Sequence, residues 1–206
     1  MKTANKRFPL FICIFIAALI LPIIIYSSVQ IYLLLTFDKE EYVISVMVER
    51  YNSEFICEGK NEIKDADDTV IFTLKPSAKP ELTVTATFCE KAVERPIFPV
   101  LFSHQRIVED DFFEQIMKET VEGELQLPYA LSDSTVDTAA KELFSIKEKV
   151  YEQKIKYVKT EQLSYVDDYF TVDVTYKGEK GEITLDSRIR EQYIKNQIEA
   201  FIENNS

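Results

Sequence analysis

The sequence predicts an α+β protein in which one N-terminal transmembrane helix is followed by an exported domain of antiparallel strands packed with three or four helices. Three observations predict this fold class. The 30 positions 8–37 carry no charged side chain. Several later segments alternate apolar and polar residues, which is typical of half-buried antiparallel strands. Other segments place apolar residues three and four positions apart, which indicates amphipathic helices.

The uncharged run is long enough for a retained membrane anchor. A signal peptide has an apolar region of about 7–15 residues, whereas a membrane span needs about 20. Cleavage near Ser27 and Ser28 would leave the apolar residues 31–35 as an exposed new terminus. We therefore expect a transmembrane anchor over 8–37, with signal-peptide cleavage as the alternative.

The residues before the run predict its orientation. Lys2, Lys6 and Arg7 precede it, and such positive flanks remain on the cytoplasmic side. We expect a single-pass protein of the cell membrane, with a short cytoplasmic N-terminus at 1–7 and an extracytoplasmic C-terminal domain.

The charge of this domain limits its partners. All 35 acidic residues and 21 of the 24 basic residues follow position 37, which gives this part a formal charge of −14. Nucleic acid is excluded as a partner because its phosphates would be repelled. Cationic peptides and metal ions remain possible, although solubility alone explains such a charge.

Residues 38–127 predict a first subdomain that begins with a helix near 39–52. Asp38 and Glu41 have capping-box spacing, and a strand over 43–48 is the alternative. The apolar face of this helix is expected at Ile44, Met47, Val48 and Tyr51.

Three strands are then expected at 54–60, 69–75 and 81–88. The inward side chains of the third are expected to be Leu82, Val84, Ala86 and Phe88. Residues 95–109 contain Pro96 and Pro99, which suits an irregular crossing segment or a sheet edge. Asp111 and Glu114 then begin a helix that ends at Gly123, with Phe113, Ile116, Met117 and Thr120 on one side.

Residues 128–206 predict a second subdomain. A linker at 125–135 leads to a helix capped by Ser134 and Asp137. Its heptad positions are Val136, Leu143, Val150 and Tyr157, joined by Ala140, Phe144, Tyr151 and Val158. Because Lys147 and Lys154 interrupt this pattern, a helix lying on a sheet is favoured over a coiled coil.

The chain is expected to end with a hairpin and a helix. Strands at 169–176 and 182–185 flank a turn at 177–181. Phe170, Val172, Val174 and Tyr176 should face inward. The apolar residues of the last helix are Ile194, Ile198, Phe201 and Ile202.

Two cysteines beyond the anchor form a possible disulfide. Cys57 and Cys89 both lie in strand candidates, and an exported domain would be in an oxidising compartment. The bond would stabilise the fold by roughly 3 kcal/mol. However, Cys89 falls on the polar side of its strand, so the sulfur atoms meet only in some registers, and the pairing stays open.

Few other residues have catalytic potential. His104 is the single histidine and adjoins Ser103, but no glycine-framed nucleophile elbow is present. Turns and helix caps account best for two acidic clusters. These clusters are Asp65, Asp67 and Asp68, and then Glu109, Asp110, Asp111 and Glu114.

These observations favour a non-catalytic interaction or accessory module that binds a protein or peptide partner at the outer membrane face. We expect no catalytic residue, cofactor or metal site. The alternative is a cell-surface hydrolase or wall-modifying enzyme that uses acidic residues such as Asp167 and Asp168. Adjacent carboxylates on a turn are poorly placed for the separation of about 5–10 Å that glycoside hydrolysis requires.

Overall fold

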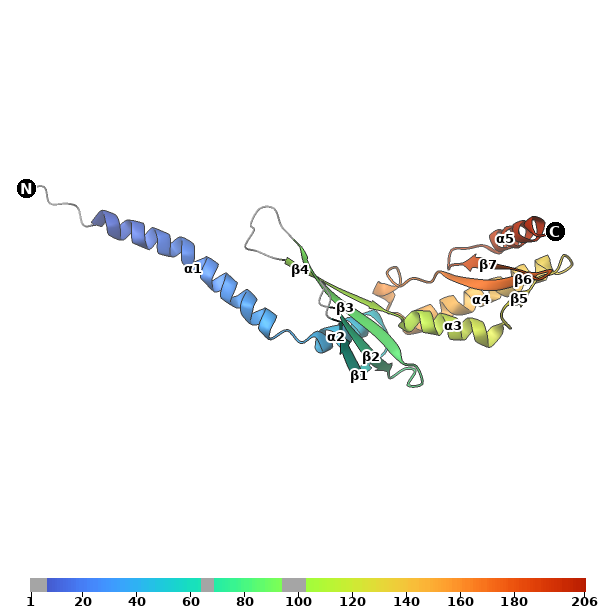
Figure 1. Cartoon of the computed structure of the whole chain (residues 1–206), viewed down its shortest axis with the longest axis horizontal. Helices are drawn as coiled ribbons and strands as arrows, with labels where there is room; N and C mark the ends of the chain where they lie inside the picture. The colour runs from blue at the N-terminus through green and yellow to red at the C-terminus, as the bar shows by residue number, and fades with distance from the viewer. Residues whose placement is uncertain (1–6, 64–68, 94–102) are drawn as a thin grey trace, which may run out of the picture. The chain divides into compact units, whose positions relative to one another are not determined.

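The computed structural model describes residues 7–63, 69–93 and 103–206, and the side chains of a few of these are not described. The chain forms two compact units, Met1–Lys39 and Glu40–Ser206. The first contains the helix α1, Arg7–Leu35, which includes Pro22 (Figure 1). Within the described residues, no helix combines the length and the apolar character that crossing a membrane requires.

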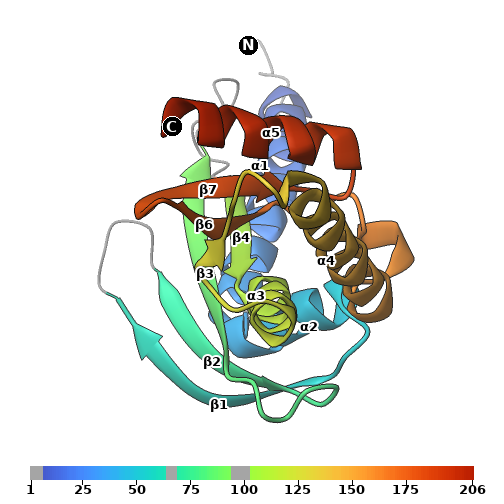
Figure 2. The ribbon, with the colours of Figure 1, turned by 90° about the vertical axis from the view of Figure 1, so that its right-hand side faces the viewer.

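The first half of Glu40–Ser206 is a four-stranded antiparallel sheet with two helices. Its strands β1 (Phe55–Glu62), β2 (Val70–Pro76), β3 (Val84–Val93) and β4 (Ser103–Asp110) are paired in chain order. Helices α2 (Lys39–Arg50) and α3 (Phe112–Glu124) precede and follow them. Figure 2 shows the sheet curving around both helices. The predicted helices and three strands are confirmed. β4 lies at an edge of the sheet, which agrees with one of the two alternatives for 95–109, whereas Pro96 and Pro99 lie outside the described residues.

Alternation along β3 is confirmed for Val84, Ala86 and Phe88, which are buried. Leu82 was also predicted to face inward, but it lies before the start of β3 and is only half-buried. The face of α2 differs from the prediction by one position at its start. Val43 and Met47 are buried, whereas Ile44 is only half-buried. The buried residues of α2 are four positions apart. Apolar residues also occur at other positions of this helix, so the sequence pattern did not single out the buried ones.

The second half contains a three-stranded sheet and two long helices. Its elements are β5 (Tyr129–Ala130), α4 (Val136–Tyr157), the 3₁₀ helix η1 (Thr160–Gln162), β6 (Phe170–Tyr176), β7 (Glu179–Leu185) and α5 (Glu191–Asn204). The hairpin and last helix are confirmed. The linker prediction was incomplete, because Tyr129 and Ala130 pair in parallel with β6. A strand of two residues is too short to produce a periodic pattern.

Helix α4 has α3 and α5 as its main helix neighbours, and Figure 2 shows it beside both. The preferred prediction of a helix lying on a sheet stays a prediction. Leu143 and Val150 are buried as predicted, but Tyr151 is exposed, and Lys147 and Lys154 are buried too. Sequence position alone does not reveal that a lysine has an internal partner.

The predicted cap of α4 by Ser134 and Asp137 is wrong, because Thr135 occupies the N-cap position and makes no side-chain capping bond.

An aromatic cluster connects the two halves. The ring of Phe112 on α3 meets the rings of Tyr51, Phe55 and Tyr157 edge-on, with centroid distances of 4.8, 5.3 and 6.1 Å. Backbone bonds reinforce this contact, because Asn52 N donates to Tyr157 O at 2.7 Å. The end of α2 is thereby attached to the end of α4.

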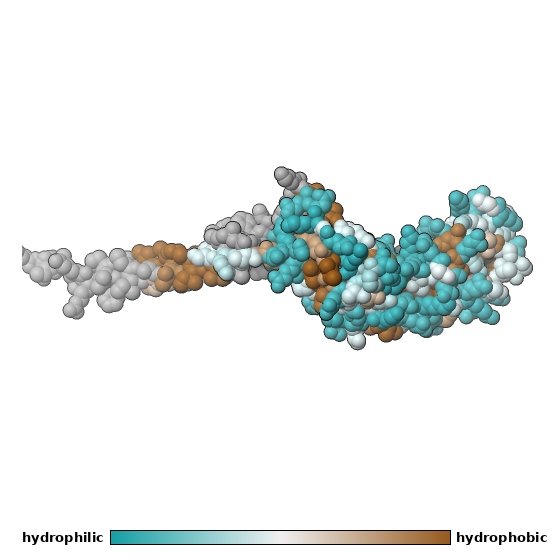
Figure 3. Space-filling model, turned by 90° about the horizontal axis from the view of Figure 1, so that it is seen from below, coloured by the Kyte–Doolittle hydropathy of each residue, from teal (hydrophilic) through white to brown (hydrophobic). Residues whose placement is uncertain are grey.

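The surface of this unit is largely hydrophilic in the view of Figure 3, with scattered hydrophobic areas.

Candidate functional site

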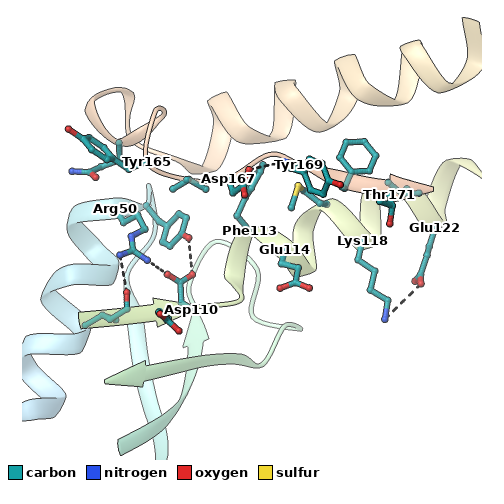
Figure 4. Close-up of a pocket in the computed structure, with 18 of the residues that line it drawn as sticks. Arg50, Asp110, Phe113, Glu114, Lys118, Glu122, Tyr165, Asp167, Tyr169 and Thr171 are labelled. Carbon is teal, nitrogen blue, oxygen red and sulfur yellow. Dashed lines mark hydrogen bonds and ion pairs between the residues drawn. The ribbon is translucent and has the colours of Figure 1, made fainter. Parts of the chain in front are cut away.

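A groove of about 970 Å³ lies within Glu40–Ser206. One wall comes from the ends of α2 and β4 and from α3. The other comes from the segment that runs from η1 into β6. We call it the α3–β6 groove. Figure 4 shows Glu114 and Lys118 on one wall, with Tyr169 and Thr171 on the other.

The inner end of the groove is held by Asp110, the last residue of β4. Its side chain is only 1% exposed and forms an ion pair with Arg50. The hydroxyl of Tyr51 donates to Asp110 Oδ1 at 2.8 Å, and the backbone N–H of Phe112 donates to the same oxygen at 3.1 Å. Asp110 therefore connects α2, β4 and α3. Both oxygens of its carboxylate are engaged in these structural contacts.

Burial, together with the negative charge of Asp110, raises the pKa of the Tyr51 hydroxyl well above its usual range. This hydroxyl therefore stays protonated and acts as a hydrogen-bond donor. It cannot serve as a base near neutral pH. The contact is structural in character.

The acidic cluster before α3 has the predicted structural role, with one difference. Asp111 occupies the N-cap position without a side-chain capping bond. Its Oδ1 instead accepts a hydrogen bond from Thr85 N at 2.7 Å, which fastens β3 to the start of α3. Asp110 supplies the bond to the helix N-terminus, while Glu109 and Glu114 are exposed.

Asp167 and Asp168, the candidates for the hydrolase alternative, have opposite environments. Asp168 Oδ2 lies 3.0 Å from Lys154 Nζ, and this pair is buried. Asp167 is exposed along the groove, where its Oδ1 accepts a hydrogen bond from Tyr169 N at 3.1 Å. The structure does not gather these two residues into one reactive site.

Two tyrosines beside these residues are exposed at the groove. Tyr165 is 80% exposed and Tyr169 is 54% exposed, and both line the α3–β6 groove. Exposed aromatic side chains grouped at a concavity are characteristic of interaction sites. The sequence analysis missed them, although the stretch 165–169 contains two tyrosines beside acidic residues, which is a recognisable signal.

Cys57 and Cys89 are free thiols, on strands β1 and β3 with β2 between them. Two strand spacings amount to about 10 Å, which is more than the ~7 Å between Cα atoms that a disulfide tolerates. The hypothesis of a bond thus gains no support. Burial, followed by the charge of Glu40, raises the pKa of the Cys57 thiol, which disfavours its reactive thiolate form.

The remaining candidates lie largely outside the described part. The backbone of His104 pairs with Ala92 in the β3–β4 ladder, but its side chain is not described. Asp65, Asp67 and Asp68 also lie outside the described residues. Among the described residues there is no group of three histidine, cysteine, aspartate or glutamate side chains that could bind a metal ion.

Comparison of the chain with known protein families, curated proteins and solved structures finds no match.

Proposed function

We propose that this protein is a membrane-tethered interaction module, which binds a protein or peptide partner in the α3–β6 groove at the outer face of the cell membrane. One observation carries the proposal: Tyr165 and Tyr169 are both exposed, and both line the concave α3–β6 groove. Tyrosine supplies a large contact area and a polar end at low cost in side-chain entropy, which makes it frequent in binding interfaces.

The tether in this proposal is supported by the sequence. Positions 8–37 lack charge and follow three basic residues, and α1 is helical over Arg7–Leu35. Several side chains of α1 lie outside the described part. The topology is tested by a cysteine introduced at Asn204 in a full chain whose Cys13, Cys57 and Cys89 are replaced by alanine, because the two free thiols of the domain would otherwise be labelled as well. We expect an impermeant thiol reagent to label it on intact cells. Labelling only after permeabilisation would contradict the orientation.

The enzyme alternative has weaker support. The carboxylate of Asp168 is engaged by Lys154 in the interior, and the neighbouring Asp167 is exposed. Glycoside hydrolysis needs two carboxylates that face a common cleft. A binding module requires only a shaped surface with anchoring side chains, which the α3–β6 groove provides.

Site-specific photocrosslinking tests the binding proposal. The full-length protein is made in its own membrane with a photoreactive amino acid in place of Tyr165. A matched control carries it in place of Tyr193, which is 58% exposed on α5 and does not line the groove. We expect a discrete polypeptide adduct from position 165 and none from 193. Equal adducts from both positions, or none from either, would refute the proposal.

A further inference from the structure

We infer that the α3–β6 groove binds a basic polypeptide segment, rich in arginine or lysine, of its partner. This inference rests on the proposed function and specifies the partner's chemistry. The first observation is the imbalance of charge along the groove. Six carboxylates line it against two cations, Arg50 and Lys118. The carboxylates belong to Glu109, Asp110, Glu114, Glu122, Asp167 and Asp173.

The two cations leave most of this negative charge uncompensated. Arg50 is committed to Asp110 at the inner end. Lys118 lies 4.0 Å from Glu122, and both side chains are largely exposed, so this pair is weak. Glu109, Glu114 and Asp173 are exposed and form no ion pair within the described part of the chain.

The positions of the charges suit an elongated cationic ligand. Glu114 belongs to the α3 wall and Asp167 to the opposite wall, as Figure 4 shows. Arginine or lysine side chains between the walls can pair with either carboxylate. The faces of Tyr165 and Tyr169 also attract such cations through their π electrons. A guanidinium group could satisfy both preferences at once, because it is planar and forms paired hydrogen bonds.

Other ligand classes fit less well. Polyanions are repelled by the charge of the groove. A neutral apolar peptide would cover exposed carboxylates without pairing them, and removing water from an unpaired charge is costly. A single metal ion lacks a preformed cluster among the described residues. Charge complementarity therefore selects a basic segment.

The test uses the full-length protein in detergent micelles and fluorescein-labelled deca-arginine as the probe. The groove variant is Glu114→Gln with Asp167→Asn. The control variant, Glu152→Gln with Glu203→Gln, removes two charges from exposed residues on α4 and α5. We expect the groove variant to weaken binding by about fivefold to tenfold, since each exposed pair contributes modestly. The control should change binding by less than about twofold.

A second variant separates the contribution of the two exposed rings from that of the carboxylates. Tyr165→Ala with Tyr169→Ala keeps every carboxylate and removes both exposed rings. It should also weaken deca-arginine binding by about fivefold, through loss of the cation–π contacts. Matching thermal unfolding by circular dichroism would verify that each variant is folded. Deca-glutamate should not bind.

Equal weakening by the groove and control variants, or no weakening by either, would overturn the inference, since binding would then reflect overall charge. The proposed function has a separate outcome, because photocrosslinking at position 165 does not depend on the partner's charge. An adduct at 165 together with unselective deca-arginine binding would retain the groove and reject a basic partner.

Discussion

Lys154 Nζ lies 3.0 Å from Asp168 Oδ2, and the two side chains are only 6% and 12% exposed. This ion pair joins α4 to the turn before β6. The turn also carries Asp167 and Tyr169, which line the α3–β6 groove. The buried pair therefore positions one wall of the proposed binding site.

Loss of one partner from this pair should destabilise the fold. Asp168→Asn leaves the ammonium group of Lys154 buried without a countercharge, which typically costs about 3–5 kcal/mol. Denaturant unfolding of the full chain measures this change. The control is Asp167→Asn, which removes the same charge from an exposed neighbour and should change stability by less than about 0.5 kcal/mol. Equal effects of both substitutions would show that the pair has no special role.

Replacing both partners together gives a further prediction. The double variant Lys154→Met with Asp168→Leu removes both buried charges and keeps apolar volume at the site. Replacement of a buried pair by hydrophobic residues is often neutral or stabilising. We expect its free energy of unfolding to lie well above that of Asp168→Asn. A double variant as unstable as the single one would indicate that packing, and not charge, accounts for the loss.

The Tyr51 hydroxyl should make the fold sensitive to alkaline pH. Burial raises its pKa in the folded state, whereas in the unfolded chain it ionises at about pH 10. Its contribution is therefore fully present below about pH 10 and is lost as the pH rises above that value. Tyr51→Phe should reduce the fall in stability between about pH 10 and 12. The exposed Tyr193→Phe is the control. An unchanged alkaline profile in Tyr51→Phe would contradict this assignment.

Two glycines should respond oppositely to alanine. A Cβ at Gly181 on β7 would lie within 3.0 Å of ring atoms of Phe201, whereas the same atom at Gly123 on α3 meets nothing within 4 Å. Gly181→Ala should destabilise by about 1–3 kcal/mol through overpacking. Gly123→Ala should stabilise by up to about 1 kcal/mol through helix propensity. Thermal unfolding separates the two, and restored stability on adding Phe201→Leu to Gly181→Ala would confirm the clash.

The thiols of Cys57 and Cys89 are expected to stay unpaired, because β2 separates their strands. Alkylation of the denatured protein without a reductant should modify both. Protection of both from alkylation until a reductant is added would mean that they pair with each other and that the order of the β1–β2–β3 strands is wrong.

Local patterns predicted local structure well. The burial of Val84, Ala86 and Phe88 follows from the alternation of side chains along a strand, which each residue and its neighbours determine. The same reasoning located α3 and the β6–β7 hairpin. The predicted face of α2 was displaced by one residue at its start. The strand β5 was not predicted, because a strand of two residues has no recognisable alternation.

The candidate site depends on contacts that no local pattern contains. Arg50 and Asp110 are 60 positions apart in the chain, and their pair forms only when α2 and β4 meet. The pairing of Asp168 with Lys154 likewise gives two adjacent aspartates opposite environments. The acidic residues, and with them a possible cationic partner, are visible in the sequence. The position of the carboxylates on facing walls is not, because that arrangement depends on how the two halves pack.

Hydrogen exchange of the full-length protein with and without deca-arginine tests the central claim most directly. If the ligand binds in the α3–β6 groove, exchange should be slower in two separate segments, 109–118 and 165–173, because the bound ligand covers both walls. Exchange in α5 over Glu191–Asn204 should be unchanged. Slower exchange confined to α5, or spread evenly over Glu40–Ser206, would contradict binding in the groove.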